Sequence, residues 1–290
     1  MQENRVRKAK LQMIISTAAF GTIGIFRRWI TLPSSALAMT RGLIGALFLL
    51  SVHLIKKTPF DKTGIRKNGV KLILSGALIG FNWITLFESY NYTSVAKATL
   101  YYYFAPIFLI ILSVIFLKEK LSKKKVLCIG IAVIGIVFVS GVLEGSTVSN
   151  PDDSKGFMLG ILSGAMYGTV MFINKAITGI DASDKTLIQI ATAGTVMLIY
   201  GSATGDFSGI TLTPLCIIMV LIVGIFHTGF CYTLFFGSMD VLSAQTVAIF
   251  TYIDPAVAVI LSALLLKEPL SIQGIIGAIL VIGSALISEI

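Results

Sequence analysis

One stretch of this sequence occurs twice. The first copy covers residues 94–122 and the second covers residues 243–271, and a shift of 149 positions superimposes them without a gap. A proline and a closing Leu-Lys-Glu motif fall on their counterparts, Pro106 on Pro255 and residues 117–119 on residues 266–268. A gapless match over about thirty residues indicates an internal duplication, so the chain is expected to fold as two related halves.

The composition is that of a membrane protein. Of the 290 residues, 56% are hydrophobic and 13% are charged, and the mean hydropathy is +0.91, whereas soluble domains carry about 25% charged residues. The sequence therefore predicts an all-α membrane protein, because apolar runs of roughly 20 residues with short connections fill almost the whole chain. We expect ten transmembrane helices, at residues 10–29, 33–55, 69–89, 92–117, 124–142, 155–177, 184–203, 213–237, 241–266 and 271–289.

The net charge of +9 does not indicate nucleic-acid binding, because the basic residues stand between apolar runs. With the N-terminus in the cytoplasm, seventeen of the 23 Lys and Arg residues lie on the cytoplasmic side and four lie outside. Cytoplasmic loops of membrane proteins carry this excess of positive charge. The sequence thus predicts a multi-pass protein of the plasma (inner) membrane with both termini in the cytoplasm.

Five spans per half is an odd number, so the second half is expected to enter the membrane upside down. The predicted halves, residues 1–143 and 155–290, form an inverted repeat. Many secondary transporters are built in this way, with the substrate bound near the midplane. Small residues four apart also favour close helix packing in lipid, and they recur at Gly156, Gly160, Gly164 and Gly168 and at Gly76 and Gly80.

A family resemblance rests on four features of the first half. These are Arg41 in the second span, Thr93-Ser94 at the start of the fourth, Pro106, and the motif at 118–122. The second half repeats the pattern with Pro255 and the motif at 267–271. Over its whole length the chain resembles the drug/metabolite transporter superfamily, EamA-type transporters. The resemblance implies a ten-helix inverted-repeat carrier of small metabolites, but it does not imply one substrate.

Four ionisable residues lie within the predicted spans, away from the cytoplasmic flanks: Arg41, Glu88, Lys97 and Asp254. Intramembrane charges are costly, usually face an interior cavity and mark functional sites. Glu88 and Lys97 flank a short turn and could instead form a structural ion pair. Arg41 and Asp254 are predicted to face a cavity, or to pair permanently with each other. Asp254 and Glu88 are the candidates for coupling transport to protons.

The two equivalent prolines predict two equivalent helix breaks. Pro106 and Pro255 each leave the carbonyl four residues earlier without its helical donor, at Tyr102 and Thr251. Paired broken helices often border the binding site of a transporter, although a simple kink that lets helices fit together is the alternative.

The aromatic residues of the fourth span supply further candidates. On a continuous helix Lys97, Tyr101 and Phe104 share one face, which lines either a pocket or the core. Asn82 and Trp83 of the third span could add polar groups. The candidate substrate-binding residues are therefore Arg41, Asn82, Trp83, Lys97, Tyr101, Phe104 and Asp254.

The sequence predicts a secondary transporter that moves a small polar or amphipathic, amino-acid-like metabolite by alternating access, with proton coupling as one option. The runner-up is a multidrug or aromatic-cation exporter. A channel or a membrane enzyme is the more distant alternative. No phosphate loop, His-Glu-x-x-His or Gly-x-Ser-x-Gly motif occurs, so we expect no enzyme activity, cofactor or metal. The expected partners are a small-molecule substrate and the lipid bilayer, without nucleic acid, for a monomer or homodimer.

The charge bias makes a topology prediction. Single cysteines at Lys62 and Lys123 should react with a membrane-impermeant thiol reagent only from the cytoplasmic side, and one at Asp152 only from outside. Labelling of positions 123 and 152 from the same side would contradict the inverted repeat.

Overall fold

The structure is a computed structural model that describes residues 2–93, 95–139, 143, 153–207, 210, 212–266 and 272–289. Its regular elements are helices throughout this part of the chain. The first half contains α1 (Gln2–Arg27), α2 (Ser34–Lys56), α3 (Lys62–Ser89), α4 (Val95–Tyr102), α5 (Ala105–Phe116) and α6 (Lys123–Val139). The second half contains α7 (Asp153–Ala176), α8 (Ala182–Thr204), α9 (Pro214–Ile222), η2 (Val223–Phe230), α10 (Cys231–Ser238), α11 (Ala244–Thr251), α12 (Ile253–Leu266) and α13 (Ile272–Glu289).

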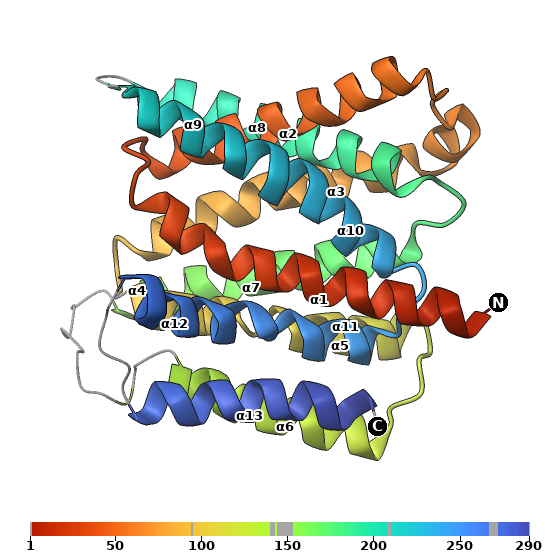
Figure 1. Cartoon of the computed structure of the whole chain (residues 1–290), viewed down its shortest axis with the longest axis vertical. Coiled ribbons are helices and arrows are strands. Elements are labelled where there is room, and N and C mark those ends of the chain that lie inside the picture. The colour runs from red at the N-terminus through yellow and green to blue at the C-terminus, as the bar shows by residue number, and fades with distance from the viewer. Residues whose placement is uncertain are drawn as a thin grey trace.

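These elements run back and forth along one bundle axis. Elements α4–α5, α9–η2–α10 and α11–α12 each follow one another as a single rod, and if each rod is counted once, the described residues form ten helical segments. In Figure 1, α1 begins and α13 ends at the same end of the bundle, which we call the termini end, and we call the opposite one the far end. The all-α prediction is confirmed.

Seven helices in the described part of the chain are long and apolar enough to cross a membrane, and the 272–288 segment is a shorter apolar helix. Helices α1 and α3 begin at Gln2 and Lys62, before residues 10 and 69, where the apolar runs predicted the spans to start. At α3 the reason is a cap, because the Asp61 side chain accepts a hydrogen bond from the backbone N–H of Gly64 at 2.8 Å. A side-chain acceptor at this position satisfies one of the donors that a helix start leaves unpaired.

The rods α4–α5 and α11–α12 are interrupted where the two prolines predict a break. Pro106 lies in the first turn of α5 and Pro255 in the first turn of α12. Proline is tolerated at these positions because its missing N–H would have no partner there in any case. The breaks fall at residues 103–104 and at residue 252, so the two interruptions occupy matching places in the two halves.

The first helix of each half packs against the other half. Helix α1 contacts α10, α11 and α12, whereas α7 contacts α3, α4 and α5. In Figure 1, α6 and α13 lie side by side at one edge of the bundle, and α2 and α8 lie toward the opposite edge. Because α1 and α7 each pack against the other half, the interface between the halves runs through the centre of the bundle.

Equivalent glycines make equivalent contacts in the two halves. A Cβ added at Gly168 of α7 would lie 2.6 Å from the Ala105 carbonyl oxygen and 2.5 Å from the Phe108 Cβ. A Cβ added at Gly21 of α1 would lie 2.5 Å from the Asp254 carbonyl oxygen and 3.0 Å from the Val257 Cβ. The shift of 149 positions places Ala105 on Asp254 and Phe108 on Val257. Equivalent residues of the two repeats therefore make equivalent packing contacts.

Two glycines on α1 provide a matched test of this packing. Gly21 meets α12 as described above, whereas a Cβ added at Gly24 would have no atom of the described residues within 4 Å apart from its own chain neighbours and the adjacent backbone of α1. We expect Gly21→Ala to lower the melting temperature of the detergent-purified protein, because α1 and α12 must separate to admit the methyl group. Gly24→Ala should leave it unchanged or raise it, because Ala stabilises a helix by about 0.5–1 kcal/mol relative to Gly. Equal melting temperatures for the two variants would contradict the close approach.

Candidate functional site

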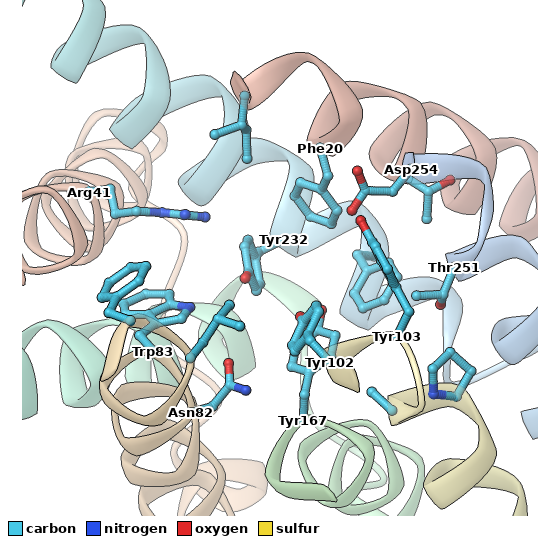
Figure 2. Close-up of a pocket in the computed structure, with 17 residues that line it drawn as sticks. Phe20, Arg41, Asn82, Trp83, Tyr102, Tyr103, Tyr167, Tyr232, Thr251 and Asp254 are labelled. Carbon is cyan, nitrogen blue, oxygen red and sulfur yellow. The ribbon is translucent and has the colours of Figure 1, made fainter. Parts of the chain in front are cut away.

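A cavity of about 160 Å³ lies in the centre of the bundle, where the two halves meet. Figure 2 shows the 17 residues that line it. Helices α1, α2, α3, α5 and the end of α4 contribute from the first half, and α7, α10, α11 and α12 contribute from the second. Most of the lining residues that Figure 2 labels have polar side chains. These are Arg41, Asn82, Tyr102, Tyr103, Tyr167, Tyr232, Thr251 and Asp254.

Arg41 of α2 is positioned by a hydrogen bond from its Nε and by an aromatic ring. Its Nε donates to the Thr228 Oγ1 at 3.1 Å, and its guanidinium carbon lies 5.1 Å from the centre of the Trp83 ring. Among the residues that the structure describes, no carboxylate forms an ion pair with Arg41. A guanidinium that is positioned but not neutralised can bind an incoming carboxylate or phosphate.

The partner of Arg41 depends on an unusual stretch of helix. Residues Val223–Phe230 form the π-helix η2, in which the Thr228 hydroxyl donates to the Val223 carbonyl five residues earlier at 3.0 Å. The wider turn leaves this hydroxyl oxygen able to accept from Arg41 as well. π-Helical turns inside α-helices frequently occur at functional sites, and this one fixes the orientation of the cavity's basic group.

Asp254 lies on the other side of the cavity, in the first turn of α12. Figure 2 shows Arg41 and Asp254 on opposite walls, with Tyr232 and Tyr103 between them. The Asp254 carboxylate has no ion pair with any described Lys, Arg or His residue. Negative charge is favoured at a helix N-terminus, so the broken rod α11–α12 provides a position where a carboxylate can face the cavity.

Aromatic rings form much of the wall between these two charges. The Tyr102 ring lies 5.5 Å from the Tyr167 ring, and the Phe20 ring lies 5.0 Å from the Tyr232 ring, measured between centroids. Such rings offer apolar faces to a ligand and hydroxyl groups for hydrogen bonds. The cavity therefore combines a cation, an anion and an aromatic lining.

Asn82 connects the cavity wall to α7. Its Nδ2 donates to both the backbone carbonyl and the hydroxyl of Ser163, each at 2.7 Å, and the Ser163 hydroxyl donates back to the Asn82 carbonyl at 3.2 Å. Both residues are buried. Since the amide donors are already used, Asn82 has only its Oδ1 to offer a ligand and mainly holds α3 against α7.

Of the residues proposed from the sequence for substrate binding, coupling or helix breaks, five line this cavity: Arg41, Asn82, Trp83, Pro106 and Asp254. Tyr102 and Thr251, which the sequence analysis named for their backbone carbonyls, line it as well. Pro255 is buried next to it in the first turn of α12. Glu88 lies outside the lining, toward the far end, where it accepts hydrogen bonds from the Tyr200 hydroxyl at 3.0 Å and from Asn91 at 3.3 Å. The side chain of Lys97 is outside the described residues, so its pairing with Glu88 stays a prediction.

Two aromatic candidates lie elsewhere. The Tyr101 ring packs edge-on against Phe157 with centroids 4.9 Å apart, and its Cβ lies close to Gly160 of α7. Phe104 precedes the first turn of α5 and is not part of the lining. Tyr102 and Tyr103 take the expected place instead. The sequence analysis named only the carbonyl of Tyr102, and it missed Tyr103, which lies in the break at residues 103–104 and not on a helix face.

Sequence comparisons place these features in a known family. The EamA-like transporter family matches the chain twice, at residues 7–141 and 154–289. The chain belongs to the EamA-like transporter family. The protein is therefore a membrane transporter and not an enzyme, and the two matches correspond to two family domains in one chain.

Relatives of this EamA-family protein extend over most of its length. YxxF, an uncharacterized transporter of Bacillus subtilis (strain 168), is 32% identical over 87% of this chain and 80% of its own. An uncharacterized transporter of Archaeoglobus fulgidus is 22% identical over 98% of this chain and 97% of its own. A solved crystal structure superimposes with a TM-score of 0.84 at 15% identity, covering 97% of this chain and 96% of the other, which shows a shared fold.

The contact between Arg41 and Thr228 makes a testable prediction. Thr228→Val removes the hydroxyl that orients the guanidinium, and it should weaken binding of an anionic or zwitterionic ligand about tenfold, since a hydrogen bond to a charged group contributes about 1.5–3 kcal/mol. Thr228→Ser keeps the hydroxyl and is the matched control, expected to bind normally. The dissociation constants are read from ligand-dependent thermal stabilisation, and equal constants for the two variants would contradict the positioning role.

Proposed function

We propose that the protein is a secondary carrier for a small zwitterionic, amino-acid-like metabolite, which it moves across the plasma membrane by alternating access. The observation that carries the proposal is the placement of Arg41 and Asp254 on opposite walls of one cavity. Arg41 comes from the first half and Asp254 from the second. A ligand with one carboxylate and one amine can engage both halves at once.

The chemistry of the wall matches such a ligand. The Arg41 guanidinium can bind a carboxylate through two parallel hydrogen bonds, and the Asp254 carboxylate can accept from an ammonium group. The rings between them can cover an apolar or aromatic side chain. A cavity of about 160 Å³ is close to the roughly 150 Å³ engineered cavity that admits benzene, so a ligand the size of a small amino acid fits.

The architecture supports alternating access. In the proposal, ten segments cross the membrane as two inverted halves, residues 1–143 and 155–290, with both termini in the cytoplasm. The equivalent packing of Gly21 and Gly168 means that an exchange of conformations between the halves preserves similar contacts. Two states of similar energy on the two sides of a central site are what alternating access requires.

Asp254 is also the proposed coupling group. The first repeat has only Ala105 at the matching position, so the carboxylate breaks the symmetry of the two halves at the cavity. A carboxylate with no ion-pair partner among the described residues can release a proton when it binds a substrate ammonium group. This exchange links proton movement to substrate movement. Glu88 lies outside the cavity lining, so we assign the coupling role to Asp254 and not to Glu88.

A second candidate function is the export of aromatic cations. It is favoured by the tyrosine rings of the wall together with the carboxylate of Asp254, because a cation is attracted to both. In that case Asp254 would be required and Arg41 would not, because a guanidinium repels a cationic substrate. The two functions therefore make opposite predictions for Arg41.

Two substitutions test the proposal in proteoliposomes. Thermal-shift screening against a metabolite library first supplies a ligand. Arg41→Gln is then expected to abolish both exchange and accumulation, because the carboxylate of the substrate loses its partner. Asp254→Asn should lose accumulation driven by a pH gradient, and it should weaken binding of the zwitterion on the order of tenfold, because the ammonium group loses its charged partner. Glu88→Gln is the control of the same charge type outside the cavity and is expected to transport normally.

The outcomes separate the candidates. Normal transport by Arg41→Gln with loss in Asp254→Asn would favour the cation exporter and contradict the zwitterion carrier. Accumulation driven by a pH gradient that survives in Asp254→Asn would end the coupling role of this residue.

A further inference from the structure

The repeated Leu-Lys-Glu motif has a defined set of contacts in the first half. The connection between α5 and α6, which carries the motif, lies against the N-terminus of α11. The Glu119 Oε2 accepts a hydrogen bond from the backbone N–H of Ala244 at 3.0 Å. Gln245 accepts from the Ser122 backbone N–H at 3.1 Å and donates to the Lys120 carbonyl at 2.7 Å. These bonds join the first half to the second.

A lysine from α7 completes this arrangement. The Lys175 Nζ lies 3.2 Å from the Glu119 Oε1 and donates to the Leu242 carbonyl at 2.6 Å. The side chains of Lys175 and Glu119 are only 9% and 22% exposed, so the pair is shielded from water and interacts more strongly than a surface pair. We call Glu119, Lys175 and the start of α11 the Glu119 clamp.

The clamp holds a helix that lies between the cavity and the termini end. Helix α11 starts at the clamp with Ala244 and ends at Thr251, which lines the cavity. Every residue of α11 is buried. On this side of the cavity, α11 is therefore enclosed by its neighbours along its whole length, and we call it the cavity floor.

The matching helix of the other half is packed differently. The shift of 149 positions aligns residues 247–251 of α11 with residues 98–102 of α4. All five of these α11 residues are buried, whereas among the α4 residues only Ala98 is buried and the next four are partly exposed. Helices α11 and α4 thus occupy equivalent sequence positions but differ in burial over these residues. The more buried helix, α11, is the one that the Glu119 clamp holds.

We propose that Glu119 is a gating residue, which keeps the carrier closed at the termini end by fastening the N-terminus of α11 to the first half. This inference rests on the proposed function, because it assigns a role within alternating access. Opening toward the termini end requires the bonds from Glu119 to Ala244 and Lys175 to break, so that α11 can move away from α5 and α6. The aligned Glu268 lies outside the described residues, and the proposal concerns Glu119.

The location of the carboxylate explains why the motif needs an acidic residue there. The first backbone N–H groups of α11 have no partner within the helix, and a carboxylate at a helix N-terminus is further stabilised by the helix dipole. An amide at position 119 could still accept one hydrogen bond but could not pair with Lys175. Glu119→Gln therefore weakens the clamp while the size of the side chain is conserved.

The test measures access to the cavity and needs no substrate. In a variant without Cys128, Cys216 and Cys231, a single cysteine replaces Thr251 at the cavity floor. A membrane-impermeant maleimide is applied to right-side-out and to inside-out vesicles, and the rate of labelling is measured from each side. Glu119→Gln is expected to raise the rate from the termini side about tenfold, the change that a free-energy loss of about 1.4 kcal/mol produces, and to lower the rate from the far side.

Two further variants make the result decisive. Lys175→Gln removes the other partner and is expected to shift labelling in the same direction, which covers the case in which Glu119→Gln does not reach the membrane. Glu88→Gln removes a carboxylate near the far end and is expected to leave both rates unchanged. Unchanged rates in both clamp variants, or rates that rise equally from the two sides, would overturn the gating role.

The labelling experiment separates this inference from the proposed function. A shift in labelling with no transport of any zwitterion would leave the gate in place and contradict the proposed substrate class. Unchanged labelling in clamp variants of a working zwitterion carrier would contradict the gate alone.

Discussion

The structure depends on close backbone contact between the two halves. At Gly21 and Gly168 the helices α1 and α7 approach the opposite rods so closely that a methyl group would meet a backbone carbonyl. In lipid, helices gain no hydrophobic free energy from associating, so such close packing is what holds a bundle together. The Gly21 contact is made to the carbonyl of Asp254, which means that the same packing that joins the halves also positions the acidic group of the cavity.

Much of the fold could be predicted from the sequence. The duplication and the apolar runs predicted an all-α chain in two related halves, and Pro106 and Pro255 predicted that two rods break at matching points. The position of Tyr103 could not be predicted in this way. Residues 103–104 leave the helix, and a few residues of irregular backbone change which side chains face inward. Helical periodicity describes only the unbroken parts of a rod.

Some residues of the candidate site could be predicted from the sequence, and others could not. Arg41 and Asp254 were found because charges are rare within apolar spans and usually face a cavity. The support of Arg41 by Thr228 was not predictable, since a π-helical turn such as η2 has no reliable sequence signal and brings together residues 187 positions apart. Glu119 stood out as part of a repeated motif, but its role required the structure, because its partners Lys175 and Ala244 come from the other half.

In the proposed carrier, one cavity recognises both charges of a zwitterion. The most direct measurement compares binding of free amino acids with binding of their amides and of their N-acetyl derivatives to the purified protein by isothermal titration calorimetry. The amide keeps only the amine, and the N-acetyl derivative keeps only the carboxylate. A free amino acid is expected to bind more tightly than both derivatives, and the loss of either charge should raise the dissociation constant on the order of tenfold. Equal binding of the amide would contradict a role for Arg41, and equal binding of both derivatives would contradict the account as a whole.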